Sequence, residues 1–248
     1  REVRPDVIVN PAAYTAVDQA ERDVDAAQAV NARAPAVLAE EAQMLGALMV
    51  HYSTDYVFDG TLTRPYLESD APAPISVYGA SKLAGEQAVA THCERHLTLR
   101  TSWVVGAHGG NFVKTMLRLA QERDHLSVVS DQQGAPTSAS WLAELSAHLV
   151  RQAQREKKHF PYGLYHATAS GATDWHAYAC HVIERARAAG RPIRVAPEAI
   201  QPITSAQHPT AARRPLNSRL DTGLLQATFG WHPPDWKTGV DHILNQLL

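Results

Sequence analysis

The stretch that decides the fold is H-Y-S-T-D-Y-V-F-D-G at His51–Gly60, followed by Y-G-A-S-K-L-A-G-E at Tyr78–Glu86. The apolar residues A-L-M-V just before it show no helical spacing, which is typical of a buried parallel strand. Such a strand would carry Ser53, Thr54 and Asp55 to its carboxyl end, where open α/β sheets bind their ligands. We therefore expect a parallel α/β sheet with a ligand site at this edge.

Tyr78 and Lys82 are four residues apart in a segment that is typical of a helix beginning near Val77, so their side chains share one helical face. A free phenol has a pKa of about 10 and is a poor acid–base catalyst near neutrality, whereas a nearby ammonium group lowers that pKa. Thr54 could then hold the same substrate oxygen that Tyr78 protonates. The alternative is a surface Tyr–Lys pair on an ordinary helix. The S-T-D-Y-V-F-D-G segment upstream favours the catalytic interpretation.

Length and composition narrow the class of protein. The chain has 248 residues, of which 45% are hydrophobic and 19% charged, with a net charge of −2. This length fits one large α/β domain or two smaller ones. The small net charge gives no general attraction to nucleic acid or membrane surfaces, and no apolar run is long enough to span a membrane. Two cysteines, Cys93 and Cys180, fit reduced thiols in a cytoplasmic protein, and no structural metal site is expected.

The two motifs together resemble the extended short-chain dehydrogenase/reductase superfamily and, within it, the dTDP-4-dehydrorhamnose reductase family. The similarity continues in V-N-P-A-A-Y-T-A-V-D-Q-A-E at Val9–Glu21, L-R-T-S-W-V at Leu99–Val104, D-Q-Q-G-A-P-T at Asp131–Thr137 and R-R-P-L-N-S-R-L-D-T at Arg213–Thr222. It covers nearly the whole chain. The resemblance implies a doubly wound, Rossmann-like, mostly parallel sheet with a smaller mixed α/β substrate-binding lobe.

The activity that the resemblance implies is reduction of the 4-keto group of dTDP-4-dehydro-L-rhamnose to dTDP-L-rhamnose by NADPH or NADH. This step serves the synthesis of cell-surface polysaccharide such as lipopolysaccharide. Tyr78 would donate a proton to the developing alkoxide, Lys82 would poise the phenol and bind the nicotinamide ribose, and Thr54 would hold the carbonyl oxygen. Asp55 and Trp103 would orient the small-molecule dTDP-sugar. Trp103 also fits a place in the core, because it lies amid a run that contains β-branched residues.

Other residues gain an expected role through the same resemblance. The turn at Ala13, Tyr14 and Thr15 would run beside the cofactor, although a plain strand-to-helix loop is the alternative. Asn31 would support the active-site region, and the alternative is an ordinary polar residue of a helix. Ser140 stands near a position where some members have a glutamate that helps to bind Mg²⁺ between subunits. A hydroxyl does not replace a carboxylate ligand for this hard cation, so a Mg²⁺ site and a homodimer both stay open.

The start of the chain lacks the glycine-rich turn of a dinucleotide-binding sheet, since no G-x-G-x-x-G occurs in the sequence. We expect that an N-terminal βαβ unit of about 30 or more residues precedes Arg1 in full-length members. We also expect one of its strands to lie between Asp6–Asn10 and Met49–Ser53. The expected division is a cofactor domain at 1–110 and 138–170 and a substrate lobe at 111–137 and 171–248.

Two rival functions stay open. A nucleotide-sugar epimerase or 4,6-dehydratase of the same superfamily is disfavoured, because dehydratases follow the threonine with an Asp–Glu pair and this chain has Asp55 and Tyr56 after Thr54. A non-catalytic regulatory subunit, similar to the β subunit of methionine adenosyltransferase, can retain both tyrosine and lysine. The preference for NADPH or NADH depends on a residue expected before Arg1.

Overall fold

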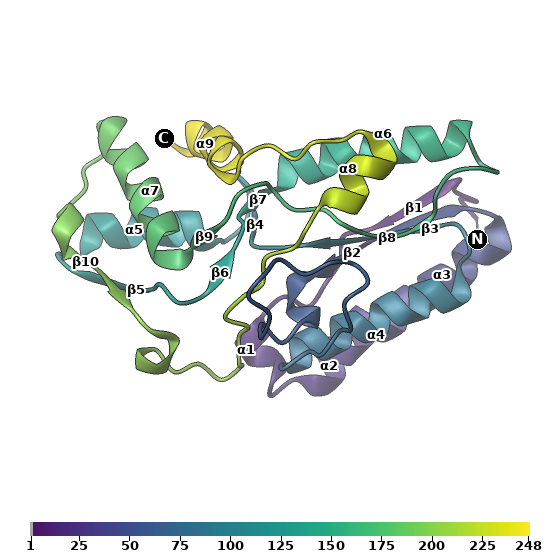
Figure 1. The fold of residues 1–248 in the computed structure, drawn as a ribbon, viewed down its shortest axis with the longest axis horizontal. Coiled ribbons are helices and arrows are strands. Elements are labelled where there is room, and N and C mark those ends of the chain that lie inside the picture. Colours follow the sequence, from purple (N-terminus) through teal and green to yellow (C-terminus); the bar gives the residue numbers. More distant parts are fainter. Residues whose placement is uncertain (1) are drawn as a thin grey trace. The chain divides into compact units, whose positions relative to one another are not determined.

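The computed structural model describes residues 2–248, and the chain divides into two compact units (Figure 1). Three segments of the chain build each unit. Of the described residues, the first contains 2–101, Ala143–Ala167 and Thr210–His232. The second consists of Ser102–Leu142, Thr168–Pro209 and Pro233–Leu248.

Unit 1 contains the predicted parallel sheet. Its four strands lie in the order β1-β2-β3-β8, and every neighbouring pair is parallel. The strands are β1 (Val7–Asn10), β2 (Leu48–Thr54), β3 (His96–Thr101) and β8 (Gly163–His166). Because parallel strands require crossover connections, helices lie between them in the sequence and cover the sheet.

The expectation that a strand lies between the first two strands is wrong. β1 pairs directly with β2, with Val7 opposite Leu48 and Asn10 opposite His51. The Asn10 amide nitrogen contacts Nδ1 of His51 at 3.2 Å across this pair. One helical crossover joins the two strands, and strands that follow one another in sequence are usually neighbours in the sheet.

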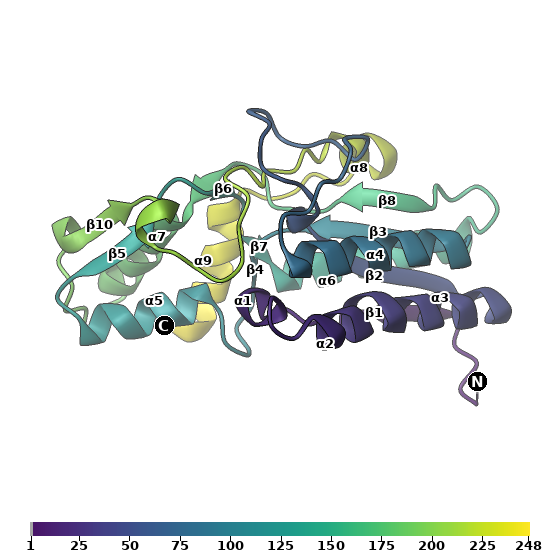
Figure 2. The ribbon, with the colours of Figure 1, turned by 90° about the horizontal axis from the view of Figure 1, so that it is seen from below.

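Helices α3 (Ala34–Leu45) and α4 (Val77–His92) lie side by side on one face of the sheet (Figures 1 and 2). The Ala-rich composition near Asp25–Leu45 predicts helix, and the structure divides this helical segment into α2 (Val24–Gln28), a π-helix η1 (Ala29–Arg33) and α3. Pro35 stands just after the π-turn and has no amide hydrogen for the carbonyl of Asn31 four residues earlier. A short helix α1 (Val17–Ala20) precedes this group.

The alternation of side chains along β2 explains how both faces are covered. Met49 packs with Ala42 of α3 and Val89 of α4 in one core cluster. Tyr52 points to the opposite face, where its hydroxyl lies 2.6 Å from Oγ of Ser146 in α6 (Ala139–Arg155). Helix α8 (Gly223–Phe229) packs beside β8 through an aromatic contact of Phe229 with the Tyr165 ring, with centroids 4.9 Å apart.

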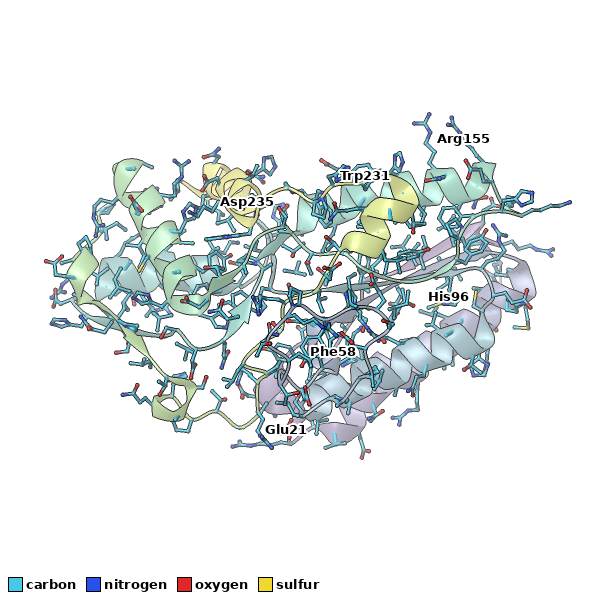
Figure 3. The ribbon with its side chains drawn as sticks, in the orientation of Figure 1. Glu21, Phe58, His96, Arg155, Trp231 and Asp235 are labelled. Atoms are coloured by element: carbon cyan, nitrogen blue, oxygen red, sulfur yellow. The ribbon has the colours of Figure 1, made fainter. Side chains whose placement is uncertain are left out.

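The loop between β2 and α4 is tied to the Arg213–Thr222 segment. Asn217 donates to the carbonyl oxygens of Leu62 and Arg64 at 2.7 and 2.8 Å. Phe58, labelled in Figure 3, stacks on Tyr66 of this loop with ring centroids 4.2 Å apart. Hydrogen bonds and a small apolar cluster around Phe58 and Tyr66 therefore both hold this loop to the rest of the unit.

Unit 2 is a small mixed lobe made of short strands and longer helices. Strand β4 (Val104–Val105) pairs in parallel with β7 (Thr137–Ser138), β5 (Leu126–Val129) in parallel with β10 (Ile200–Ile203), and β6 (Gln133–Gly134) antiparallel with β9 (Thr173–Asp174). Its helices are α5 (Phe112–Glu122), α7 (Trp175–Ala188) and α9 (Trp236–Leu247). The 3₁₀ turns are η3 (Pro197–Ala199) and η4 (Ser205–Gln207).

The core of unit 2 lies between these helices. Tyr178 and Ile183 of α7 pack with Val113 of α5 and Val240 of α9. The sequence at Asp174–Ala189 predicts a helix capped by Thr173 or Asp174 and ended by Gly190. The structure confirms it as α7, and the cap is the Asp174 side chain, which accepts from the amide of Ala177 at 2.8 Å. A search for a helix long and apolar enough to cross a bilayer finds none among residues 2–248.

Candidate active site

The carboxyl end of β2 places Thr54 and Asp55 as the sequence predicts. The strand ends at Thr54, and the 3₁₀ turn η2 (Asp55–Val57) follows at once. The Thr54 hydroxyl donates to Oδ1 of Asp55 at 3.0 Å and accepts from the amide of Tyr56 at 3.2 Å. Both Thr54 and Asp55 are buried, so this turn holds two polar side chains in a fixed arrangement at the sheet edge.

Helix α4 brings Tyr78 and Lys82 to the same region of unit 1. The helix begins at Val77, where Ser76 caps it by accepting from the amide of Gly79 at 3.1 Å. The amide of Val77 donates to Oε1 of Glu21, labelled in Figure 3, at 2.8 Å. Both contacts satisfy amides that a helix start leaves without partners, so the first turn, which carries Tyr78, is held firmly.

Tyr78 and Lys82 are not paired in the way that the sequence analysis expected. Burial raises the pKa of Tyr78 to about 12; the hydrogen bond with Thr54 offsets this only in part, and the charge of Asp55 adds to the rise. The Lys82 ammonium donates to the carbonyl oxygen of Tyr52 at 2.6 Å. The expected lowering of the phenol pKa by Lys82 is therefore absent here, and Tyr78 is protonated at neutral pH, as a proton donor must be.

Asp55 is the second titratable group of this edge. Burial raises the pKa of its carboxyl to about 7, although hydrogen bonds from Ser218 and Thr54 lower it. Its Oδ2 atom is buried and has no hydrogen-bond partner within residues 2–248. A carboxyl group in this state can be neutral at physiological pH and donate a hydrogen bond to a substrate oxygen.

We expect Asp55→Asn to stabilise the protein at alkaline pH. A pKa raised from about 3.8 to about 7 makes the folded state bind the proton more tightly, so stability is lost as pH rises between these values. The ionised carboxyl should cost up to about 4 kcal/mol above pH 7, whereas asparagine stays neutral. Denaturant unfolding should therefore show a gain for the variant at about pH 8 that is absent near pH 4.

A matched substitution checks the sign of this effect. Hydrogen bonds from Thr61 and Tyr66 lower the pKa of Asp59, a neighbouring acidic residue that is partly exposed. Asp59→Asn should therefore lose stability at about pH 8. An equal gain in stability for Asp59→Asn and Asp55→Asn at about pH 8 would contradict the raised pKa of Asp55.

The turn at Ala13, Tyr14 and Thr15 lies at the carboxyl end of β1, beside the end of β2. Asn31 of the π-helix holds this turn: its Oδ1 accepts from the amide of Tyr14 at 2.8 Å, and its Nδ2 donates to the Tyr14 carbonyl at 3.1 Å. The same Nδ2 donates to Oγ of Ser81 in α4 at 3.0 Å. Asn31 thus links the turn to the helix that carries Tyr78.

Trp103 lies in unit 2 and is not part of a strand. The sequence at His96–Val105 is typical of a buried strand, but β3 stops at Thr101 and Trp103 adopts a left-handed backbone with φ of 47°. Its ring stacks on Trp175 with centroids 3.7 Å apart and an interplanar angle of 14°. Trp103 is half-buried. Positive φ is unusual for a tryptophan and marks positions at which the surrounding structure imposes a conformation.

Glu86 and Arg100 belong to the surroundings of this site and were not assigned by the sequence analysis. They form a buried ion pair beneath Lys82 on the α4 face of the sheet. The signal was the spacing of Lys82 and Glu86, which are four residues apart and share a helical face, as Tyr78 and Lys82 do.

The arginines of the Arg213–Thr222 segment make contacts within unit 1. Arg214 pairs with Asp18 at 2.6 Å, and Arg219 donates to the carbonyl of Thr63 at 2.6 Å. The sequence leaves two roles open for these arginines, contact with the diphosphate of a nucleotide sugar or structural pairing, and the contacts of Arg214 and Arg219 support the structural role.

The described chain, residues 2–248, contains no group of three or more histidine, cysteine, aspartate or glutamate side chains placed to hold a metal ion. His92 and His96 are four residues apart in sequence, but α4 ends at His92, and His96, labelled in Figure 3, begins β3. Oγ of Ser140 lies 2.6 Å from Oγ of Ser138. These contacts supply no carboxylate for Mg²⁺ at Ser140.

A parallel α/β sheet with threonine at a strand end, next to a helix that carries tyrosine and lysine four residues apart, defines the class of extended short-chain dehydrogenases/reductases. The family described as "RmlD substrate binding domain" matches residues 1–248. The dTDP-4-dehydrorhamnose reductases of Shigella flexneri and Escherichia coli K12 are each 50% identical over 248 residues, which is 100% of this chain and 82% of each relative. The chain belongs to the dTDP-4-dehydrorhamnose reductase family.

Solved structures agree with this result. The crystal structure of dTDP-4-dehydrorhamnose reductase from Bacillus anthracis in complex with NADP is similar, with a TM-score of 0.88 and 37% sequence identity. The match covers 99% of this chain and 82% of that chain. The predicted doubly wound, mostly parallel fold is therefore confirmed.

Proposed function

We propose that this protein reduces the 4-keto group of dTDP-4-dehydro-L-rhamnose to dTDP-L-rhamnose, with NADPH or NADH as the hydride donor. The observation that carries the proposal is the 50% identity to curated reductases of this name along the whole chain. It is supported by the positions of Thr54, Tyr78 and Lys82 in one unit at the carboxyl end of β2.

Each residue of the site would have its own role in the reduction. The nicotinamide cofactor supplies the hydride when bound. Tyr78 is the proton donor to the developing alkoxide, and its raised pKa keeps the proton in place until the hydride arrives. The Thr54 hydroxyl hydrogen-bonds to Tyr78. Its single hydrogen, which is donated to Asp55 in this structure, would turn to the substrate oxygen when the keto-sugar binds. Asp55 in its neutral form can hold a sugar hydroxyl or the carbonyl.

The chain's own residues also fit a dinucleotide. Lys82 has three donor hydrogens, of which the Tyr52 carbonyl takes one, so the others can hold the hydroxyls of a ribose. The turn at Ala13, Tyr14 and Thr15 offers small side chains and backbone at the adjacent strand end. The Tyr14 hydroxyl donates to Asp23 at 2.8 Å, so this turn would meet the cofactor mainly with its backbone.

The proposal extends to the parts of the protein and its setting. Unit 1 would bind the cofactor and unit 2 would orient the dTDP-sugar, with Trp103 as a contact. The setting would be the cytoplasm, where dTDP-L-rhamnose serves lipopolysaccharide and related surface polysaccharides. The assembly would be a homodimer, and no nucleic acid or membrane partner is proposed.

Turnover of the keto-sugar tests the function directly. The full-length protein is mixed with NADPH or NADH and dTDP-4-dehydro-L-rhamnose. We expect loss of the reduced nicotinamide absorbance and formation of dTDP-L-rhamnose, identified by NMR. Binding of the cofactor without any turnover, together with stoichiometric capture of a methionine adenosyltransferase, would replace this proposal with the regulatory-subunit alternative.

Trp103→Ala is expected to raise the KM for the dTDP-sugar by about 10-fold, because a kcal/mol or two of ring contact is lost. The Tm of the protein without ligand should fall only slightly, since Trp103 is half-buried and stands outside the strands. Trp236→Ala is the control, because Trp236 is buried in the core of unit 2. It should lower the Tm strongly. If Trp103→Ala also lowered the Tm strongly and left the KM unchanged, the role of Trp103 would be purely structural.

A further inference from the structure

A buried ion pair lies one helical turn beyond Lys82. Glu86 on α4 accepts two hydrogen bonds from Arg100 on β3, to Oε1 from Nε at 2.9 Å and to Oε2 from Nη2 at 2.7 Å. Each side chain is only 4% exposed. Such a bidentate contact fixes the carboxylate in both position and orientation.

The surroundings of Lys82 disfavour the charged form of its amino group. Lys82 is 2% exposed, and burial lowers its pKa to about 8. The neighbouring His51 on β2 is neutral, because burial and the Lys82 charge lower the pKa of His51 to about 3. Tyr78 on α4 is protonated at neutral pH, and Asp55 is neutral in part.

Glu86 is the charged group that favours the ammonium, since its negative charge raises the pKa of Lys82 against the effect of burial. The two residues lie four positions apart on α4, the spacing at which side chains on one helical face are neighbours. Arg100 approaches Glu86 from β3 and also lies over the Phe58 ring, 5.0 Å from its centroid. Arg100 therefore fixes the position of the carboxylate whose charge acts on Lys82.

We propose that Glu86, clamped by Arg100, is a positioning residue that keeps Lys82 charged in the interior of unit 1. Lys82 then meets the cofactor ribose and the reacting phenol as an ammonium group. The role in catalysis rests on the proposed function, whereas the protonation state of Lys82 does not. A purely structural pair is the rival interpretation, and buried ion pairs often stabilise a fold little relative to apolar residues of the same size.

Titration of Lys82 by NMR tests this proposal without any enzymatic reaction. The chain has five lysines: Lys82, Lys114, Lys157, Lys158 and Lys237. Lysines labelled with ¹³C at Cε are followed against pH in the full-length protein, and loss of a signal in Lys82→Arg assigns Lys82. We expect Glu86→Gln to lower the Lys82 midpoint by at least about one pH unit, the size of the effect of a nearby opposite charge.

Two further variants separate charge from stability. The double variant Glu86→Gln/Arg100→Met removes both charges, so it avoids the buried arginine without a partner that Glu86→Gln alone would leave. Its Lys82 midpoint should still be below that of the wild type. Leu149→Ala removes a fully buried side chain of α6 on the opposite face of the sheet. It should lower the Tm and leave the Lys82 midpoint unchanged. If Glu86→Gln does not fold, the Lys82 midpoint of the double variant tests the proposal instead.

Kinetics give the second readout. The alkaline limb of kcat/KM for keto-sugar reduction should move to lower pH in Glu86→Gln by the same amount as the Lys82 midpoint. A Lys82 midpoint that stays within about 0.3 units of the wild type in both variants would overturn the proposal. Absence of keto-sugar turnover in the wild type would instead overturn the proposed function, and the NMR result would still stand.

Discussion

Tyr78→Phe should lower kcat for keto-sugar reduction by about 10²–10⁴-fold, the loss typical of a missing general acid. The substitution removes one oxygen from α4 and leaves the ring in place, edge-on to Tyr56 with centroids 5.8 Å apart. Substrate affinity should change little, because the proton is needed only as the alkoxide develops. Stopped-flow measurement of NADPH oxidation under single-turnover conditions isolates this step.

Two variants make the result specific. Thr54→Val removes an accessory hydrogen bond and should lose less turnover than Tyr78→Phe. Tyr66→Phe removes a hydroxyl that donates to Asp59 at 2.8 Å, and should cost about 1 kcal/mol of stability while turnover stays near normal. A Tyr78→Phe protein that keeps near-normal rates would show that another group protonates the alkoxide.

Gly85→Ala should strongly destabilise unit 1 and with it the catalytic helix. A Cβ atom at position 85 would stand 2.1 Å from the carbonyl oxygen of Asn31, and both atoms belong to packed secondary structure. Because neither is a flexible side chain, α4 has to move away from the π-helix. The cost should reach or exceed the 1–3 kcal/mol of ordinary overpacking. Chemical denaturation measures it as a lower midpoint.

The expected secondary effect of Gly85→Ala is loss of turnover. Movement of α4 would stretch the hydrogen bond from Asn31 to Ser81 and displace Lys82 from the Tyr52 carbonyl. Gly110→Ala is the matched control, since a Cβ there meets no atom within 4 Å. That variant should be close to wild type in stability and rate. Equal stability of the two variants would mean that α4 is not held against Asn31.

The sequence predicted the parts of the fold that depend on local pattern. The apolar run before His51 lies in β2, the helix expected near Val77 is α4, and Thr54 lies at the end of its strand. The neighbour of β1 was predicted wrongly, because strand order depends on where the crossover returns, and this is not encoded in a short window. The π-turn at Asn31 was missed because its residues alone favour an ordinary helix.

The electrostatics of the site were less predictable than its members. An i, i+4 pair of tyrosine and lysine suggests an ammonium beside a phenol, yet the structure directs Lys82 to a backbone carbonyl. Desolvation, which sets the pKa of Tyr78 and Asp55, depends on residues distant in sequence that close over them. The partner of Glu86 is likewise on β3, and only the fold brings Arg100 to it.

The contact between Trp103 and Gly134 carries an evolutionary consequence. A Cβ at position 134 would stand 2.6 Å from the Trp103 ring, which is already stacked on Trp175 on another side. No single substitution at position 134 is compatible with the ring in its present place. Lineages of this family that replace the glycine should therefore also carry a smaller residue at position 103, and the two positions should change together across an alignment.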